Sequence, residues 1–554
     1  MDHIQRLLTS DLVSSLLSIH PNDVGKAIDF EPPHSWLSWW NWVRDRRDDG
    51  STSAWLRLSE CFNSKNPHPT HAHEDIPQEL CELMQEIQKL QLTRRPINID
   101  GQSSENTIAS DRGMSPKKLH EVSRMVAYIA KLLDDLKIER KRVRIVDIGA
   151  GQGYLTRTLK IYLQTAQILA LDSDQWQTRG SQVWEERVAR ALRASCNDSP
   201  FTPIFHKTIH ITSDTLIPAV DEWVSETSEK IDESDPDPIL FLALHACGSL
   251  TPDILRACIS ATRREKVTWR MAGVVVVGCC YNLLKPIDFP LSKLLKSLSS
   301  TPSSHLTALQ LPSSAFNLAT QIPSQWLMSP KATSSVSLSI RKVVWRALLG
   351  RELLRSNAFG EKTKQLLELE GSGSQAAIES SQTRCASAPP SHQLHASGTP
   401  LGTGTGSETG IGVGTSPTMR RLGRLPDSAY ANWSAFLSAA GQKLKVDMSA
   451  SAKNEQDLLL ERRVEVLHAL RCLIGPLVET LIILDRVQWL KEEWAIDIPE
   501  ASTDNNGLRD SAVDTIPEKQ GGSARVEAIN LFDQATGSGR NVAIIVVPAS
   551  EFVV

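Results

Sequence analysis

The spacing of apolar residues changes along the chain and predicts elements of different kinds. Residues 1–111 carry apolar positions at helical spacing, most clearly in LCELMQEIQKLQL at 80–92, and predict a helical region. From residue 112 to about 285, short β-branched runs alternate with helical stretches; the runs are VRIVDI, QILALD, PILFLAL and AGVVVVG. This alternation predicts a parallel sheet that is covered by helices.

Residues 426–554 continue with a helical pattern and then two apolar runs. RRVEVLHALRCLIGPLVETLIILDRVQWLKEEW at 462–494 predicts a long helix that is interrupted at Gly475 and Pro476. VEAINLF and NVAIIVV follow a polar loop and predict an antiparallel hairpin. We expect this hairpin to add two strands to the parallel sheet, so that one sheet is interrupted by a long insertion.

The insertion has a low-complexity composition. Between residues 371 and 418, Gly, Ser, Thr and Pro supply 29 of 48 residues, and aromatic residues are absent. Such a segment does not bury a core and is predicted to be disordered. The predicted regions are therefore a helical region at 1–111, the main part of an α/β domain at 112–356, a partly disordered insertion at 357–425, and helices with a hairpin at 426–554 that complete the sheet.

Charge does not identify a partner for the whole chain of 554 residues, because its formal net charge is only −4. Residues 112–350, however, contain 30 Lys and Arg against 22 Asp and Glu. The basic stretches KIERKRVR and RREKVTWR both precede predicted strands, so they lie at the edge of the sheet opposite the carboxyl ends of its strands. One hypothesis is a basic docking edge there, and the other is an ordinary solvated surface.

The cysteines and the terminal segment indicate an intracellular protein, either cytoplasmic or nuclear. The nine cysteines include no C-x-x-C, and only Cys279 and Cys280 are adjacent, which is typical neither of a disulfide framework nor of a spaced zinc site. The first 21 residues lack the apolar run of a secretory signal. The longest uncharged apolar runs are strand-sized, so we expect no membrane partner.

RIVDIGAGQGYLTRTL at 144–159 predicts a buried strand, a glycine-rich turn and the start of a helix. Gly149, Gly151 and Gly153 form G-x-G-x-G, whereas a dinucleotide-binding turn places its third glycine one residue later, where this chain has Tyr154. This spacing disfavours a nicotinamide oxidoreductase. Asp172 ends the next strand, where a carboxylate accepts hydrogen bonds from ribose hydroxyls. The simpler alternative is an ordinary tight turn between a strand and a helix.

The glycine turn, taken with its flanks, resembles known proteins. Asp147 with the three glycines resembles the first motif of seven-stranded S-adenosylmethionine-dependent methyltransferases. Further segments resemble the methyltransferase-like protein 25 family, some of whose relatives are labelled ribosomal RNA adenine dimethylase domain-containing. These segments are GMSPKKLHEV at 113–122, LHACGSLTPDILRAC at 244–258, VGCCYNLL at 277–284, FNLATQIPSQW at 316–326, GPLVETLIILDR at 475–486, and LFD with GRNVAII within 531–545.

The resemblance is strong over 112–285, partial to 356, faint over 1–111, absent over 371–418, and returns from about 426 to the end. It implies a fold class: α/β, a seven-stranded Rossmann-like methyltransferase sheet with a C-terminal antiparallel hairpin. It also implies S-adenosyl-L-methionine as the cofactor. The expected cofactor-binding residues are Lys117, Asp147, Gly149, Ala150, Gly151, Gly153, Tyr154, Asp172 and His245.

Other candidate residues follow from the predicted positions of helices and strand ends. Ser115 and Pro116 begin a helix whose start the resemblance places as a lid over the cofactor. The expected catalytic residues are Glu121 or His120 as a base, with Tyr281 and Asn282 orienting the acceptor. The alternatives are a solvated helix face, a satisfied polar strand end for His245, and core packing for Cys279 and Cys280.

The methyl acceptor is open between protein and RNA. An adenine-nitrogen methyltransferase usually has a D/N-P-P-Y/F turn after its fourth strand, and this chain has LHACG there. We expect a monomer that requires no metal. Two further hypotheses concern the N-terminal region. The first is a base-stacking platform, as opposed to core packing, formed by Trp36, Trp39, Trp40 and Val43. The second is a metal site formed by His68, His71 and His73. The alternative function is a catalytically silent methyltransferase fold that binds RNA or protein.

Overall fold

The fold is taken from a computed structural model of the chain. It describes residues 1–22, 24–45, 53–64, 76–99, 113–163, 166–195, 203–227, 236–264, 268–298, 311–355, 422–446, 448, 453, 455–495, 524–536 and 539–548. The predictions for His68, His71 and His73 and for the low-complexity stretch at 371–418 lie outside these residues.

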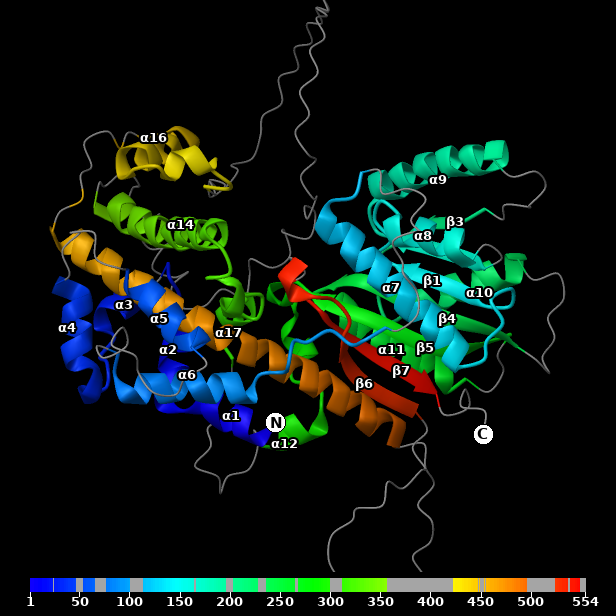
Figure 1. The fold of residues 1–554 in the computed structure, drawn as a ribbon, viewed down its shortest axis with the longest axis horizontal. Coiled ribbons are helices and arrows are strands. Elements are labelled where there is room, and N and C mark those ends of the chain that lie inside the picture. Colours follow the sequence, from blue (N-terminus) through cyan, green and yellow to red (C-terminus); the bar gives the residue numbers. More distant parts are fainter. Residues whose placement is uncertain are drawn as a thin grey trace, which may run out of the picture.

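A seven-stranded sheet forms one half of the molecule, with the strand order β3-β2-β1-β4-β5-β7-β6 (Figure 1). Its strands are β1 (Arg144–Ile148), β2 (Gln167–Asp172), β3 (Phe205–Thr208), β4 (Asp237–Cys247), β5 (Trp269–Cys279), β6 (Ala524–Asn530) and β7 (Val542–Pro548). Strands β1 to β5 are parallel, and β7 pairs antiparallel with both β5 and β6. The predicted fold class and the hairpin that completes the sheet are confirmed.

The long insertion falls between two strands that are neighbours in the sheet. Val275 on β5 pairs with Ile545 on β7, although the chain between them contains the whole helical part of the C-terminal region. Every residue of β7 is buried, because helices or neighbouring strands cover it on all sides. A continuous apolar run is therefore what this position requires, and NVAIIVV supplies it.

Helices cover both faces of the sheet. Helices α7 (Pro116–Asp135) and α8 (Tyr154–Leu163) pack with one face. Helices α10 (Leu216–Thr227) and α11 (Leu250–Thr262) pack with the other face, together with the last turns of α17 (Glu455–Ala495). Helix α9 (Gln175–Ser195) contacts β2 and β3 at the edge of the sheet. The sheet thus has the two covering layers that a parallel arrangement needs.

A second, helical core lies beside the sheet (Figure 1). Its helices are α1 (Asp2–Thr9), α2 (Asp11–Ser18), α3 (Val24–Asp29), α4 (Leu37–Asp45), α5 (Ala54–Asn63), α6 (Gln78–Leu90), α12 (Lys293–Leu298), α13 (Ser313–Leu318), α14 (Pro330–Arg355), α16 (Trp433–Leu444) and most of α17. Trp36, Trp39, Trp40 and Val43 are buried in this core, so packing explains them and a base-stacking platform does not. The predicted helical character of the N-terminal region is confirmed.

Helix α17 is continuous over 41 residues, so the predicted interruption at Gly475 and Pro476 is wrong. The residues before and after Pro476, among them Ile474 and Leu477, are buried in the helical core, and their packing stabilises the helix despite the missing N–H donor of the proline. Gly475 faces the carbonyl oxygen of Leu318 so closely that a Cβ there would lie 2.1 Å from it. Glycine at this position therefore lets α13 approach the backbone of α17.

The same helix has the length and composition of a membrane span over Gln456–Trp494. Its most apolar window is 94% buried inside the protein, because the first part lies in the helical core and the last turns lie on the sheet. Burial in a protein core accounts for this hydropathy.

The basic stretches before β1 and β5 are largely paired with acidic side chains. Arg144 lies 2.8 Å from Asp237, and Arg264 lies 3.0 Å from Asp221. Farther out, Arg140 contacts Asp134 at 3.5 Å. These ion pairs offset part of the positive charge that the sequence concentrates at this edge.

Candidate functional site

The turn after β1 has an unusual backbone at each of its glycines. Gly149, Gly151 and Gly153 have φ angles of 71°, 57° and 68°, in the left-handed region that side chains disfavour. The N–H groups of Gly149 and Ala150 both donate to the carbonyl of Leu171 on β2, at 2.8 and 3.0 Å. The turn is therefore tied to the neighbouring strand, and its residue types follow from its backbone.

The surroundings of two of these glycines differ. A Cβ at Gly151 would meet nothing within 4 Å, whereas a Cβ at Gly153 would lie 2.0 Å from the hydroxyl of Ser181 on α9. Gly153 therefore serves close packing between the turn and α9. Gly151 leaves open space in front of the backbone, which is the approach that a nucleotide-like ligand needs.

Asp172 connects the turn to the end of β2. Its Oδ2 accepts the N–H of Gly151 at 2.8 Å, and its Oδ1 accepts the N–H of Asp174 at 2.8 Å. A carboxylate has about four acceptor positions, so both oxygens retain the capacity to accept a hydroxyl donor. The predicted ribose-binding residue thus also holds the glycine turn in place.

Asp147 lies beneath the turn and is 2% exposed. The hydroxyl of Thr156, in the first turn of α8, donates to its Oδ2 at 2.5 Å. Burial raises the pKa of Asp147 to about 6, although the Thr156 hydrogen bond acts in the opposite direction. Thr156 was not predicted as a site residue. The signal in the sequence that could have identified it is a hydroxyl residue in the first helical turn after the glycines.

The start of α7 brings three charged side chains to the end of β4. Ser115 caps the helix by accepting the N–H of Lys118, as predicted, and Glu121 is 2% exposed one turn later. The Nζ of Lys118 lies 2.7 Å from Nε2 of His245 and 3.4 Å from Oε2 of Glu121. Lys117 is farther out, 3.7 Å from Oε1 of Glu121 and nearly half exposed. Lys118, which was not predicted, therefore links the start of α7 to the end of β4, whereas the predicted Lys117 contacts Glu121 on its own helix.

Lys118 is not among the cofactor-binding residues that the sequence predicts. Lys118 lies three residues before Glu121, which places both side chains on one face of a helix, and this spacing is the sequence signal that could have identified it. Nε2 of His245 also lies 3.2 Å from Oε2 of Glu121. One ring nitrogen has either a proton or a lone pair, so it bonds either to the carboxylate or to the ammonium group at a given moment.

The environment of Glu121 favours its ionised form. Burial alone would raise the pKa of Glu121, but the hydrogen bond with His245 and the charges of His245, Lys118 and Lys117 lower it to about 2. Glu121 is therefore a carboxylate at neutral pH and a weak proton acceptor.

His120 and Tyr154 bind backbone groups at the two sides of the helix start. Nε2 of His120 accepts the N–H of Asp533 at 3.0 Å, in the loop after β6. Burial and the charge of Arg124 lower the pKa of His120. The hydroxyl of Tyr154 donates to the carbonyl of Gly113 at 3.0 Å and so links the glycine turn to the segment before α7.

Tyr281 and Asn282 follow β5 in a short 3₁₀ helix, Tyr281–Leu283. Tyr281 is 2% exposed, and its hydroxyl donates to Glu479 of α17 at 3.3 Å. Burial and the nearby Glu479 carboxylate raise the pKa of Tyr281. The tyrosine thus faces the long helix, whereas Asn282 is exposed.

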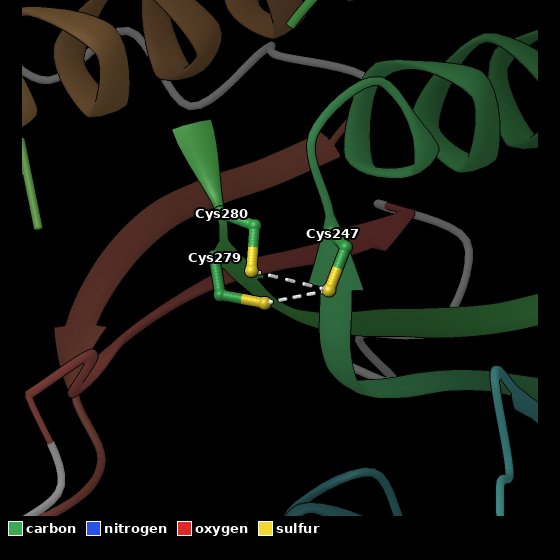
Figure 2. A group of neighbouring side chains, drawn as sticks. All are labelled: Cys247, Cys279 and Cys280. Atoms are coloured by element: carbon green, nitrogen blue, oxygen red, sulfur yellow. Dashed lines mark hydrogen bonds between the residues drawn. The ribbon is translucent and has the colours of Figure 1, made fainter. Parts of the chain in front are cut away.

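Cys247, Cys279 and Cys280 meet where β4 and β5 end (Figure 2). The Sγ of Cys247 lies 3.2 Å from that of Cys279 and 3.6 Å from that of Cys280. Hydrogen bonds from the other two thiols hold the pKa of Cys280 well below its usual range, and the pKa of Cys279 is raised. Cys247 was not predicted as a site residue, because its partners Cys279 and Cys280 lie 32 and 33 residues away in the sequence.

The described geometry is that of an α/β domain with a nucleotide-type glycine turn at the carboxyl ends of parallel strands. Comparison with protein families adds to this picture, because residues 117–286 match a family described as a methyltransferase domain. This part of the chain is therefore similar to methyltransferase domains. The match covers α7, the glycine turn and the ends of β4 and β5, which are the elements that hold the candidate site. No solved structure matches the chain.

Proposed function

We propose that the protein is an S-adenosylmethionine-dependent methyltransferase of the methyltransferase-like protein 25 type, with a protein or an RNA as acceptor. The observation that carries the proposal is the open approach to Gly151, in a turn that Asp172 holds from the next strand. The glycine spacing supports a methyl donor over a nicotinamide, and the match to a methyltransferase domain supports the same choice.

The residues present fit this cofactor. The N–H groups of the turn and the Asp172 carboxylate are suited to the nucleoside, and the paired ammonium groups of Lys117 and Lys118 at the start of α7 are suited to a carboxylate. Asp147 supports the turn from below through Thr156 and α8. When bound, S-adenosylmethionine supplies an electrophilic methyl group on its sulfonium.

The chain has to orient the acceptor and exclude water rather than generate a strong nucleophile. Glu121 is ionised and weakly basic, so we assign it the positioning of Lys118 and His245 instead of proton removal. His120 and Tyr281 anchor backbone and helix contacts, and Asn282 remains our candidate for contact with the acceptor because it is exposed at the end of β5. The segment 290–356 and the N-terminal helices shape its entry in this proposal.

Binding of the cofactor is tested first, by calorimetry with S-adenosylmethionine and its demethylated product on the full chain. We expect measurable heat with both compounds and none with NAD(H). Gly151→Ala should weaken binding, because the new methyl group enters the open approach to the turn. Gly350→Ala on α14, where nothing lies within 4 Å, is the matched control. Absence of binding to well-folded wild-type protein would refute the proposal.

Turnover is tested separately, with radiolabelled S-adenosylmethionine and cell extract. Incorporation of label that requires the active protein supports an enzyme, provided that the label falls with Gly151→Ala but not with Gly350→Ala. The fraction that carries the label shows whether the acceptor is protein or RNA. Cofactor binding without any dependent label would favour the catalytically silent binding module. The monomeric state and the intracellular location stay predictions.

A further inference from the structure

We propose that Cys247, Cys279 and Cys280 bind one thiophilic metal ion, Zn²⁺, at the carboxyl ends of β4 and β5. The proposal rests on the placement of three sulfur atoms and does not depend on methyl transfer. The three Sγ atoms all lie within 4.8 Å of one another (Figure 2). Cys247 and Cys279 end two strands that are adjacent in the sheet, and Cys280 directly follows the second strand.

The register of the sheet places the first two thiols together. Cys247 and Cys279 are paired in the parallel ladder between β4 and β5, so their side chains leave the sheet on the same face. Their Sγ atoms are 3.2 Å apart. In a tetrahedral site with Zn–S bonds of about 2.3 Å, sulfur atoms lie about 3.8 Å apart, so this pair has to open only slightly around an ion.

The third thiol reaches the same place through an unusual backbone. In an extended strand, Cys280 would point to the face opposite Cys279. Its φ of 49° and ψ of 48° are left-handed, and they turn its Sγ to 3.6 Å from that of Cys247. Cysteine does not favour the left-handed conformation. Here this conformation places the Cys280 sulfur beside the other two and so completes a set of three sulfur ligands.

The electrostatic surroundings suit an anionic centre. Three thiolates and one Zn²⁺ carry a net charge of −1, which neighbouring positive charges would offset in this partly buried position. Arg486 is 1% exposed, and its Nε and Nη2 make no hydrogen bond within the part of the chain that the structure describes. Arg486 interacts electrostatically with Tyr281, Asp485 and Asp288, and more weakly with Cys279. Arg540 and His245 act on Cys280 in the same sense. These nearby positive groups would contribute to balancing the charge of a metal–thiolate centre.

Three protein ligands leave the fourth position of a tetrahedral zinc for water or an incoming ligand, as in zinc sites that are not purely structural. The position is at the same edge of the sheet as the glycine turn, because β1, β4 and β5 are parallel. On binding, each cysteine that still carries its thiol proton releases it to solvent, and each of the three sulfur atoms forms one sulfur–metal bond, without any change of oxidation state.

Metal content is the direct test, measured by mass spectrometry on full-length protein purified under reducing conditions with zinc present. We expect about one zinc per chain, and near zero for Cys247→Ser and Cys280→Ser. The matched controls are Cys258→Ala, a buried thiol on α11, and Cys61→Ser, whose sulfur lies 3.4 Å from that of Cys81. Both controls should keep the zinc. Substitution by Co²⁺ should give thiolate-to-metal charge-transfer absorption in wild type and controls alone.

A measurement on wild-type protein covers the case in which the cysteine variants fail to fold. Zinc should slow alkylation of Cys247 and Cys280, both partly exposed, and leave the rates at Cys61 and Cys81 unchanged. Zinc that persists after all three cysteines are replaced would overturn the proposal. So would metal-free protein with a disulfide between Cys247 and either neighbour, found after blocking free thiols during lysis. Because metal content is measured without S-adenosylmethionine, its failure is separate from failure of the proposed methyltransferase function.

Discussion

The ammonium group of Lys118 lies 2.7 Å from the imidazole of His245, although 127 residues separate the two in sequence. The contact joins the first turn of α7 to the last residues of β4. It thereby fixes the helix start above the carboxyl ends of the strands, where the glycine turn also lies.

Replacing Lys118 should affect ligand binding more than replacing its neighbour. We expect Lys118→Met to raise the Kd for S-adenosylmethionine by about tenfold, which corresponds to loss of about 1.4 kcal/mol from a charged hydrogen bond. Lys117→Met should have a smaller effect, because Lys117 is more exposed and its contact is longer. Calorimetry on both variants decides the question, and equal effects would contradict the placement of Lys118.

Glu121 should make the stability of the protein depend on pH. The pKa of Glu121 is about 2 in the folded protein, against an ordinary value of 4.5, because of His245, Lys118 and Lys117. A lowered carboxyl pKa stabilises the folded state fully above about pH 4.5, and this contribution is lost as pH falls toward 2. Glu121→Gln should therefore cost about 2 kcal/mol at pH 7 and progressively less in acid.

Urea unfolding of wild type and Glu121→Gln at several pH values between 7 and 3 measures this effect. Lys131 and Asp135 provide an exposed ion pair on the same helix, so Asp135→Asn is the control and should show almost no pH-dependent difference. A Glu121→Gln difference that stays constant down to pH 3 would contradict the lowered pKa.

The two glycines with different surroundings should separate binding from folding. Gly151→Ala should cost about 1 kcal/mol of stability, from its left-handed backbone alone, and should weaken cofactor binding. Gly153→Ala should cost more, because its Cβ would overlap the Ser181 hydroxyl. Ser181→Ala should recover part of that loss. Thermal unfolding checks that Gly153→Ala costs more stability than Gly151→Ala, and calorimetry checks that Gly151→Ala is the variant that weakens cofactor binding. The effects on binding would be reversed if Gly153 rather than Gly151 faced the ligand.

Gly475 should be essential for the contact between α13 and α17. Gly475→Ala should destabilise the protein by about 1 to 3 kcal/mol, because the new Cβ would lie 2.1 Å from the Leu318 carbonyl oxygen. Gly350→Ala, in the open part of α14, should instead stabilise it by about 0.5 to 1 kcal/mol. Midpoints of denaturant unfolding give both signs, and a neutral Gly475→Ala would show that α13 moves away without cost.

The local pattern of the sequence was sufficient for much of the fold. Apolar runs of strand length predicted β1, β2, β4, β5 and the hairpin of β6 and β7, and the cap at Ser115 predicted where α7 begins. The glycine spacing likewise predicted a turn with a special backbone. These features were readable because alternation, capping and left-handed glycines are set by residues near one another in the chain.

Pairings over long distances were decided by the tertiary structure. Pro476 lies within a continuous helix because α13 and the N-terminal helices pack around it, which outweighs the local preference for a break. Cys247 meets Cys279 because β4 and β5 are adjacent and in register, and Lys118 meets His245 because α7 begins above β4. The sequence by itself determined which segments become strands, helices and turns, whereas strand order and packing determined which side chains share a site, because contacts between distant residues leave no local periodicity.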